Sequence, residues 1–258
     1  MKDALIGYSG FVGSTLLRQR SFEHLFRSTN IADVRKGRFD LVICAGAPAQ
    51  KWIANRDPEG DTENISRLIE DLDGTICERF VLISTVDVFE HPLGVDEDTP
   101  PEERRLHPYG INRLRLERFV EERFPEALII RLPGLVGPGL RKNVIYDFLN
   151  DNNLDAIDSR GVFQFYPMVN LWRDIEVALE AGLNLLHLTA APISVADVAC
   201  EGFGRKFDQE VVPSPAQYDL RTRHASSYGV EGQYQYSRRE TLLAIRAYAQ
   251  SEPRKRES

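Results

Sequence analysis

Short apolar runs alternate with segments of helical periodicity along the first half of the chain. The apolar runs cover residues 4–7, 24–28, 39–45, 80–84 and 127–132, and each predicts a strand. Between them, residues 11–18, 61–72 and 109–123 place apolar side chains at helical spacing. Nearly continuous apolar strands separated by helices are typical of a parallel sheet covered on both faces. The pattern therefore predicts an α/β fold with a doubly wound parallel sheet.

After about residue 138 this rhythm loosens. Residues 144–149 and 170–181 still predict helices, and 185–189 predicts a strand. Ser194 and Ser237 each precede an acidic residue by three positions, which is the pattern of a capping box that opens a helix. We expect a nucleotide-binding core over 1–138, and a stretch over 139–250 that completes the sheet and adds a small C-terminal substrate lobe. This stretch would not fold alone, and 251–258 would be a disordered tail.

Composition narrows the class of partner. The chain has 258 residues, 42% of them hydrophobic, and a formal net charge of −7, which argues against general affinity for nucleic acid. No apolar stretch approaches the roughly 20 residues of a membrane span, and the first strand leaves no room for a signal peptide. The widely spaced Cys44, Cys77 and Cys200 fit reduced thiols rather than disulfides or a metal site. We expect a cytoplasmic protein.

A glycine-rich turn joins the first predicted strand to the first predicted helix. Glycines in such a turn let the backbone approach a diphosphate, and the N-terminus of the helix supplies free N–H groups. The alternative is a turn that only packs the helix closely on the strand. As a binding site, the turn predicts a Rossmann-type dinucleotide fold. The cofactor contacts expected here are Gly7, Ser9, Gly10, Phe11, Val12 and Gly13.

The ends of the later strands carry further polar and small residues. Carboxyl ends of parallel strands meet at one edge of the sheet, so these segments should converge on the glycine turn. Ala45, Gly46 and Ala47 end the third strand, Ser84 and Thr85 end the fourth, and Pro133 and Gly134 follow the fifth.

Tyr109 and Arg113 lie four residues apart on a predicted helix, so both project from one face. A fixed cation beside a tyrosine stabilises the phenolate, which suits the tyrosine to general acid–base catalysis. A hydroxyl such as that of Thr85 can bond the oxygen whose proton is exchanged. Next to a nicotinamide ring, this set supports hydride transfer between an alcohol and a carbonyl.

In this combination the chain resembles the extended short-chain dehydrogenase/reductase family, which includes nucleotide-sugar epimerases, dehydratases and reductases. The resemblance spans about residues 3–200. It rests on Gly7-x-x-Gly10-x-x-Gly13, Asp40-x-Val42-x-x-Ala45-Gly46-Ala47, Pro58 with Asn64, Ser84-Thr85-Val86-Asp87-Val88-Phe89, Pro108-Tyr109-Gly110-x-x-Arg113, and the segment from Arg131 to Gly139.

The resemblance implies an NAD(P)-dependent oxidoreductase or epimerase that acts on a small metabolite, most plausibly a nucleotide-activated sugar. Tyr109 would be the acid/base and Thr85 the substrate-polarising hydroxyl. Arg113 would stand in for the lysine that grips the nicotinamide ribose, and Pro133 would touch the nicotinamide. The alternative is a non-catalytic NAD(P)-binding sensor or scaffold of the same fold, and a non-sugar substrate also stays open.

Two departures from the family pattern bear on chemistry. Arg113 replaces lysine, and a guanidinium keeps its charge but does not relay a proton. The dehydratase branch has an Asp-Glu pair where this chain has Val86 and Asp87, which disfavours a two-carboxylate elimination. Asp87 stays a catalytic candidate as a base or a sugar-hydroxyl contact, with a loop or capping role as the alternative.

Cofactor choice and substrate contacts are predicted from single positions. The second strand ends in Arg27-Ser28-Thr29-Asn30 without an acid, so Ser28 and Asn30 favour NADP over NAD at the adenosine ribose. Asn143, after two cations, is expected to bind the substrate, as is Tyr166, which could equally complete a core. Members of the family pair through the helix that carries the tyrosine, so a homodimer is an open prediction.

Overall fold

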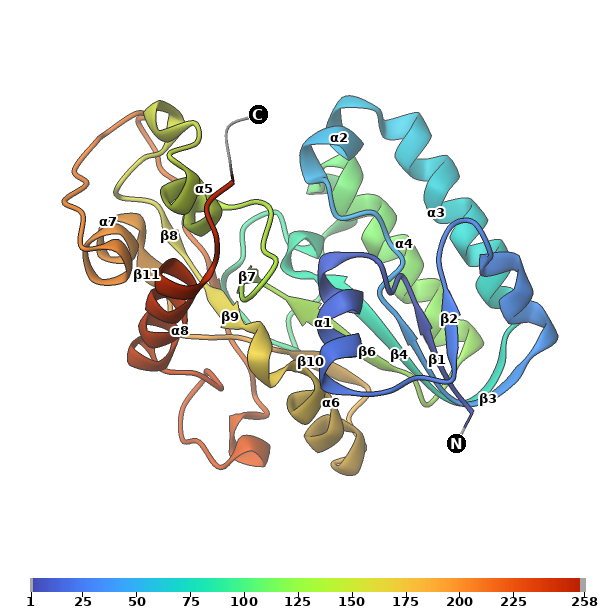
Figure 1. The fold of residues 1–258 in the computed structure, drawn as a ribbon. Helices are drawn as coiled ribbons and strands as arrows, with labels where there is room; N and C mark the ends of the chain where they lie inside the picture. Colours follow the sequence, from blue (N-terminus) through green and yellow to red (C-terminus); the bar gives the residue numbers. More distant parts are fainter. Residues whose placement is uncertain (1, 256–258) are drawn as a thin grey trace. The chain divides into compact units, whose positions relative to one another are not determined.

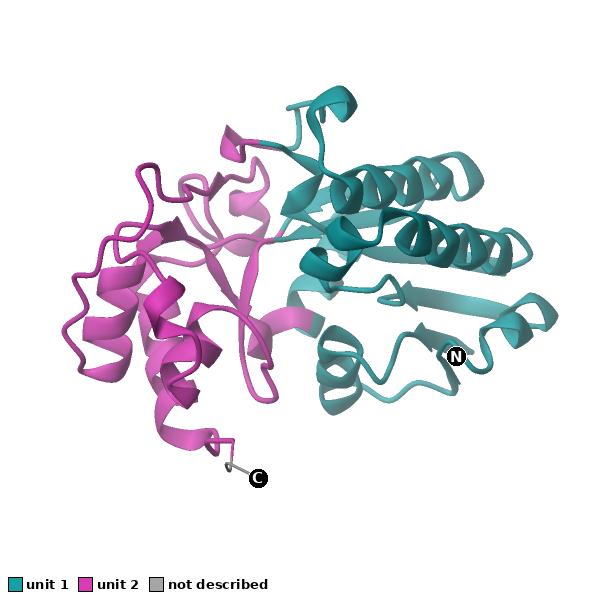
Figure 2. Cartoon of the chain, turned by 90° about the horizontal axis from the view of Figure 1, so that it is seen from above, with its two compact units in different colours: residues 1–90, 97–132, 172–187 teal, residues 91–96, 133–171, 188–258 magenta. Residues whose placement is uncertain are grey.

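The computed structural model describes residues 2–255, so part of the predicted tail lies outside the described residues. The chain divides into two compact units, shown in different colours in Figure 2. The first, here the sheet unit, takes residues up to 90, 97–132 and 172–187. The second unit takes residues 91–96, 133–171 and those from 188 on. The units interleave along the chain, whereas the expected division at residue 138 follows chain order.

The sheet unit is built on six parallel strands. They are β1 (Asp3–Ile6), β2 (His24–Phe26), β3 (Arg38–Cys44), β4 (Ile76–Thr85), β6 (Leu128–Leu132) and β10 (Leu185–His187). Their order is β10-β6-β4-β3-β1-β2, and every pairing is parallel. The chain leaves β1 for β2 at one edge and returns past β1 to β3, which makes the β1–β3 junction the switch point of the sheet. The predicted α/β class and parallel sheet are confirmed, including the sixth strand from the second half of the chain.

Helices cover both faces of this sheet (Figure 1). α3 (Pro58–Asp73) and α4 (Pro108–Arg123) lie on one face, and α1 (Phe11–Gln19) and α6 (Leu171–Glu180) on the other. On the first face the buried core joins helix residues to strand residues, among them Ile65, Leu72, Leu116, Val120, Ile6, Val42 and Phe80. Fully burying one such side chain contributes about 1.5–3 kcal/mol, so these stripes fix each helix on the sheet.

The sequence pattern did not predict one helix of the sheet unit. The six-residue α2 (Lys51–Arg56) buries only Ala54, so it lacks the apolar stripe that identifies a longer helix. It runs into Asp57, whose carboxylate accepts the Gly60 N–H at 3.0 Å and caps α3, with Pro58 at its first position.

The second unit consists of short strand pairs and helices. Its strands pair as β7 (Gly134–Val136) with β9 (Phe165–Pro167), β8 (Val162–Phe163) with β11 (Ile193–Ser194), and β5 (Leu93–Val95) with β12 (Asp219–Leu220). Its helices are α5 (Val144–Asn150), α7 (Val195–Asp197) and α8 (Arg238–Ser251). The capping box at Ser237 is confirmed, and Ser194 accepts the Asp197 N–H at 3.1 Å. In residues 2–255, no helix has the length and apolar character needed to cross a membrane.

Candidate active site

The glycine turn between β1 and α1 is tightly packed at two of its three glycines. Gly7 has φ +82°, and a Cβ there would lie 2.3 Å from the Ala45 carbonyl oxygen. A Cβ on Gly13 would lie 2.2 Å from the Gly7 carbonyl oxygen. Gly10 differs, because a Cβ there would meet only one atom, at 3.4 Å. Packing therefore requires Gly7 and Gly13, whereas Gly10 is exposed and leaves open space outside the turn.

No side chain of the described residues caps the first turn of α1. Gly10 is the N-cap and has no side chain to accept from the N–H groups of Phe11, Val12 and Gly13. The first turn also contains no acidic residue. The free N–H groups and the positive end of the helix dipole together favour an anion at this position. Ser9 is exposed beside it.

The ends of β2 and β3 lie beside this turn. The Gly7 N–H donates to the Phe26 carbonyl at 2.8 Å, and the Ala45 N–H donates to the Ile6 carbonyl at 2.9 Å. Ala45, Gly46 and Ala47 are half-buried at this edge. The sequence-based expectation that the end of the third predicted strand converges on the glycine turn is confirmed, and the end of β2 lies there as well.

The loop after β2 is organised by its own side chains. Asn30 accepts the Arg27 N–H at 2.8 Å and donates to the Leu25 carbonyl at 3.0 Å. The Arg27 Nε donates to the Thr29 hydroxyl at 3.0 Å, and Ser28 is exposed. Asn30 is thus occupied with the turn, while Ser28 faces solvent.

Three elements fix the backbone at Tyr109, the second residue of α4. The His107 Nδ1 accepts the Gly110 N–H at 3.0 Å as the N-cap of α4. The Asn55 side chain on α2 accepts the Tyr109 N–H at 3.1 Å. Gly110 allows the helix to approach the 3₁₀ turn Val86–Val88, since a Cβ there would lie 2.4 Å from the Asp87 carbonyl oxygen.

The Tyr109 side chain is 6% exposed and interacts with both Thr85 and Arg113. Burial raises its pKa above the ordinary value of 10, and the Asp87 carboxylate adds to this rise. The Arg113 charge and the hydrogen bonds from Arg113 and Thr85 act in the opposite direction. The phenol is therefore protonated at neutral pH.

Arg113 is buried, and other residues of the protein accept hydrogen bonds from its guanidinium. Its Nη1 and Nη2 donate to the two carboxylate oxygens of Asp61 at 3.2 and 3.1 Å, and Nη2 also donates to the Pro48 carbonyl. The guanidinium carbon lies 4.2 Å from the centre of the Tyr109 ring. Nε is buried and has no hydrogen-bond partner among the described residues. Asp61 thus balances the charge of Arg113, while one of its donors is left without an acceptor.

Asp87 lies between Thr85 and a lysine that the sequence did not single out. Its Oδ1 accepts from Lys51 Nζ at 2.7 Å, and its Oδ2 lies 3.4 Å from the Thr85 hydroxyl oxygen. The Asp87 N–H donates to that same hydroxyl at 3.2 Å. Lys51 begins α2, so the helix without an apolar stripe contributes a charged residue to the site.

A second buried pair lies directly behind the end of β4. Arg131 on β6 donates to both carboxylate oxygens of Glu117 on α4, the shortest distance being 2.7 Å. Ser84 donates to the same carboxylate, and Arg131 Nη1 lies 3.3 Å from His187 Nε2. Both members are at most 4% exposed. The family-like motifs of the sequence include Ser84 and Arg131 but no carboxylate partner for them. The sequence did not predict Glu117 as that partner, because its position on α4 belongs to no motif.

Three predicted residues belong to the second unit. Pro133 directly follows β6 and is buried. Asn143, with φ +97°, caps α5 by accepting the Ile145 N–H at 3.0 Å, and donates to the Leu135 carbonyl at 2.8 Å. Tyr166 is fully buried, its ring 5.6 Å from that of Tyr236. Asn143 and Tyr166 therefore have structural duties, and their roles toward a substrate stay predictions.

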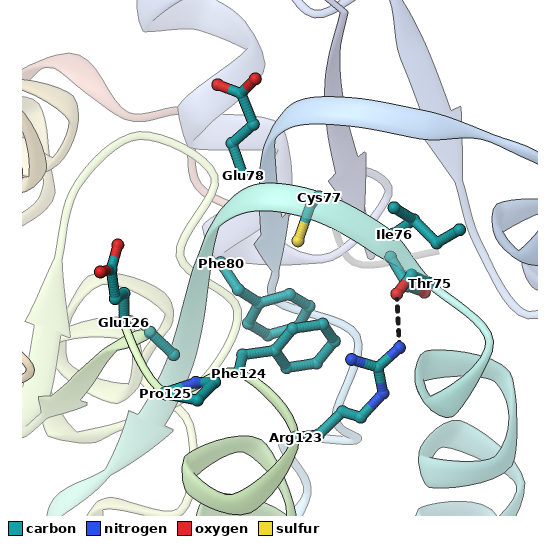
Figure 3. A pocket seen from close by; sticks show the side chains of 10 residues that line it. Thr75, Ile76, Cys77, Glu78, Phe80, Arg123, Phe124, Pro125 and Glu126 are labelled. Carbon is teal, nitrogen blue, oxygen red and sulfur yellow. Dashed lines mark hydrogen bonds between the residues drawn. The ribbon is translucent and has the colours of Figure 1, made fainter.

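A cavity of about 420 Å³ lies at the opposite end of β4 and β6 (Figure 3). Its floor contains Phe80 and Phe124, stacked with ring centres 4.3 Å apart. Arg123 donates to the Thr75 carbonyl at 3.0 Å, and burial raises the pKa of the Cys77 thiol to about 11. The cavity contains none of the residues that the sequence singled out for catalysis, which lie at the carboxyl ends of the strands.

Comparisons with known proteins give a likeness of structure without a likeness of sequence. No family model and no curated protein sequence matches the chain. The fold is similar to that of UDP-glucose 4-epimerase from Thermotoga maritima, solved with UDP-glucose, at a TM-score of 0.74 and 19% identity. That match covers 97% of this chain and 99% of the other.

Two further solved structures share the fold. RMD from Pseudomonas aeruginosa, complexed with NADPH, aligns at a TM-score of 0.73 and 16% identity over 97% of this chain and 99% of that one. The Bordetella bronchiseptica enzyme WbmG, in complex with NAD and UDP, aligns at 0.74 and 15% identity over 97% and 94%. At these identities the comparisons establish the Rossmann-like fold that the glycine turn predicted.

Proposed function

We propose that the chain is an NAD(P)-dependent enzyme that acts by hydride transfer on a hydroxyl or carbonyl of a nucleotide-activated sugar, with Tyr109 as the acid/base. The observation that carries the proposal is that Tyr109 is buried at the carboxyl edge of the sheet, where its ring stacks on Arg113 and its side chain interacts with Thr85. The likeness to enzymes solved with UDP-glucose, with NADPH, and with NAD and UDP supports this choice over a sensor or scaffold.

The residues present fit a nicotinamide dinucleotide. Gly10 leaves open space over the first turn of α1, which no side chain caps. A diphosphate there would accept hydrogen bonds from the backbone N–H groups of that turn. The Arg113 Nε, buried without an acceptor, suits a ribose oxygen. When bound, the nicotinamide supplies or accepts the hydride. Ala45, Gly46 and Ala47 would line the path between these two contacts.

The chain's own residues handle the proton. In the reducing direction, the Tyr109 hydroxyl donates its proton to the substrate oxygen, which the Thr85 hydroxyl holds by a hydrogen bond. In the oxidising direction the phenolate takes that proton back, and Arg113 and Thr85 stabilise its negative charge. Because burial raises the pKa of Tyr109, the proton to be donated is present at neutral pH.

We infer a preference for NADP from the end of β2. No acid is found among residues 27–30, and the next one, Asp33, has its carboxylate 2.6 Å from Lys36 Nζ. Ser28 is exposed, and the Arg27 guanidinium is held beside it through Thr29. Hydroxyls beside a cation suit a 2′-phosphate better than an unmodified ribose.

Titration with NADPH and NADH, followed by fluorescence, tests the cofactor site first. Tighter binding of NADPH is expected, and failure of both to bind below roughly millimolar concentrations would remove the proposal. A screen of nucleotide sugars with the preferred cofactor then tests turnover. Tyr109→Phe should lower turnover about 10²–10⁴-fold while cofactor affinity holds. Tyr248→Phe, which changes a tyrosine of α8, is the matched control and should keep full activity.

The remaining predictions rest on sequence reasoning. We propose that Asn143 and Tyr166 contribute to the substrate site and Pro133 to the nicotinamide end. The net charge of −7 supports a small-molecule partner rather than nucleic acid, and three widely spaced cysteines favour the cytoplasm. Light scattering decides between a monomer and a homodimer.

A further inference from the structure

The charges around Tyr109 form two separate pairs. Arg113 and Asp61 make the first, with both side chains at most 4% exposed. Asp87 and Lys51 make the second, 2.7 Å apart, with side chains 18% and 39% exposed. The first pair is locked inside the protein by two hydrogen bonds between its members. The second is open to solvent, and a ligand or a substitution can therefore change it.

The second pair reaches Tyr109 through Thr85. The Asp87 carboxylate lies beside the Thr85 hydroxyl, and both side chains interact with Tyr109. A carboxylate at this place opposes phenolate formation, because two negative charges repel. Lys51 lies on the other oxygen of that carboxylate and neutralises it. Without Lys51, the site would face Tyr109 with an uncompensated anion.

We propose that Lys51 is a positioning residue of the site, which neutralises Asp87 and thereby makes the Tyr109 phenol easier to ionise. The proposal rests on the function proposed above, in which Tyr109 is the acid/base. It assigns to α2 a second cation of the site, which is more exposed than the buried Arg113. The Lys51 amine lies on α2, not on α4, and it acts on Tyr109 by way of the Asp87 carboxylate.

The groups that face Tyr109 are few among the described residues, and each has a defined part. Arg113 comes from α4 itself, Thr85 from β4, and Asp87 from the turn that follows. The His107 ring, at the start of α4, has its centre 6.1 Å from that of Tyr109. Burial and Lys51 lower the pKa of His107 below 6.5, so this ring is neutral throughout an alkaline titration of Tyr109. Its charge therefore does not change during the test.

The test measures the ionisation of Tyr109 by NMR in protein labelled at the tyrosine ζ-carbon, with the resonance identified by its loss in Tyr109→Phe. Four proteins are titrated: the parent, Lys51→Gln, Asp87→Asn and the double variant. Asp87→Asn should lower the midpoint, because it removes the negative charge that opposes formation of the phenolate. Adding Lys51→Gln to that background should raise the midpoint by about one unit. Lys51→Gln alone should raise it above that of the parent.

Lys36→Gln is the matched control. Lys36 belongs to the same unit, pairs with Asp33, and carries the same charge, so its loss should leave the Tyr109 midpoint unchanged. Equal midpoints for Asp87→Asn and the double variant would overturn the proposal, as would an equal shift from Lys36→Gln. The titration needs neither cofactor nor turnover. If it behaves as expected while Tyr109→Phe retains turnover, the proposed function fails and the coupling stands.

Discussion

Two buried arginine–carboxylate pairs connect α4 to its surroundings, and they differ in what they leave unsatisfied. Arg131 and Glu117 join α4 to the sheet, and Ser84 and His187 take up their remaining hydrogen-bonding groups. Arg113 and Asp61 join α4 to α3, yet the Arg113 Nε has no partner among the described residues. A buried donor without an acceptor costs about 1–3 kcal/mol. The first pair is complete as a piece of structure, whereas the second is complete only with an added acceptor.

The two pairs differ along one helix, because one is fully hydrogen-bonded within the protein and the other leaves a donor for the proposed ligand. Glu117 lies two turns after Tyr109 on α4 and faces the sheet. Its carboxylate accepts a hydrogen bond from Ser84, which connects α4 to the end of β4. Arg113 lies one turn after Tyr109 and stacks on its ring. Arg113 and Glu117, one turn apart on α4, therefore differ in that only Arg113 keeps a hydrogen-bond donor without an acceptor. Variants that remove one pair at a time test this difference through unfolding free energy and cofactor affinity.

The largest effect is expected from Arg131→Met. It leaves the Glu117 carboxylate buried without a cation, which costs about 3–5 kcal/mol of unfolding free energy. Urea unfolding measures this loss. Adding Glu117→Leu should recover much of it, since an apolar pair of similar volume often replaces a buried ion pair without loss. A single variant as stable as the parent would show that the pair does not hold the sheet and α4 together.

The next effect separates the two arginines by ligand binding. Arg113→Gln removes the donor that lacks an acceptor, and we expect at least about a tenfold loss of NADPH affinity, as for a hydrogen bond from a charged group. Arg131→Gln is the matched substitution, and it should lower stability while leaving the affinity of the folded protein within about twofold. Isothermal titration at a temperature where both variants are folded measures the two affinities. Equal losses would assign the effect to general destabilisation.

The sequence predicted the outline of this region because its signals are local. Apolar runs gave the strands of the sheet, and the spacing of Tyr109 and Arg113 on one helix face placed them together. The glycine turn predicted the Rossmann-type fold, and the structure adds that close packing by itself requires glycine at Gly7 and Gly13. The short strands of the second unit were missed, since pairs of two or three residues, such as Val162 and Phe163, have no room to show alternation.

What the sequence could not supply were partners distant in the chain. Asp61 lies 52 residues before Arg113, and Lys51 lies 36 before Asp87. Neither carries a local pattern, because Asp61 lies within a helix read for its apolar face and Lys51 begins a helix without one. Such pairs are made by the tertiary fold. The sequence-based view of Arg113 as a fixed cation beside Tyr109 therefore lacked its counter-ion.

The smallest effect concerns the cap of α4, the helix that carries one member of each pair. The His107 Nδ1 accepts the Gly110 N–H, and a protonated ring cannot accept there. Burial and the Lys51 charge lower the pKa of His107 in the folded protein below its ordinary 6.5. Its contribution to stability is therefore present above pH 6.5 and is lost as pH falls through the lowered folded-state pKa.

His107→Asn tests this because asparagine is a good N-cap whose side chain does not titrate. Stability at pH 7 should stay within about 1 kcal/mol of the parent, the usual worth of a cap. Below pH 6.5 the parent should lose unfolding free energy faster than the variant, by the share that His107 protonation contributes. Unfolding by urea at several pH values between 7 and 5 gives both slopes. Parallel slopes would show that His107 is not the group that makes α4, and with it the position of Tyr109, sensitive to acid.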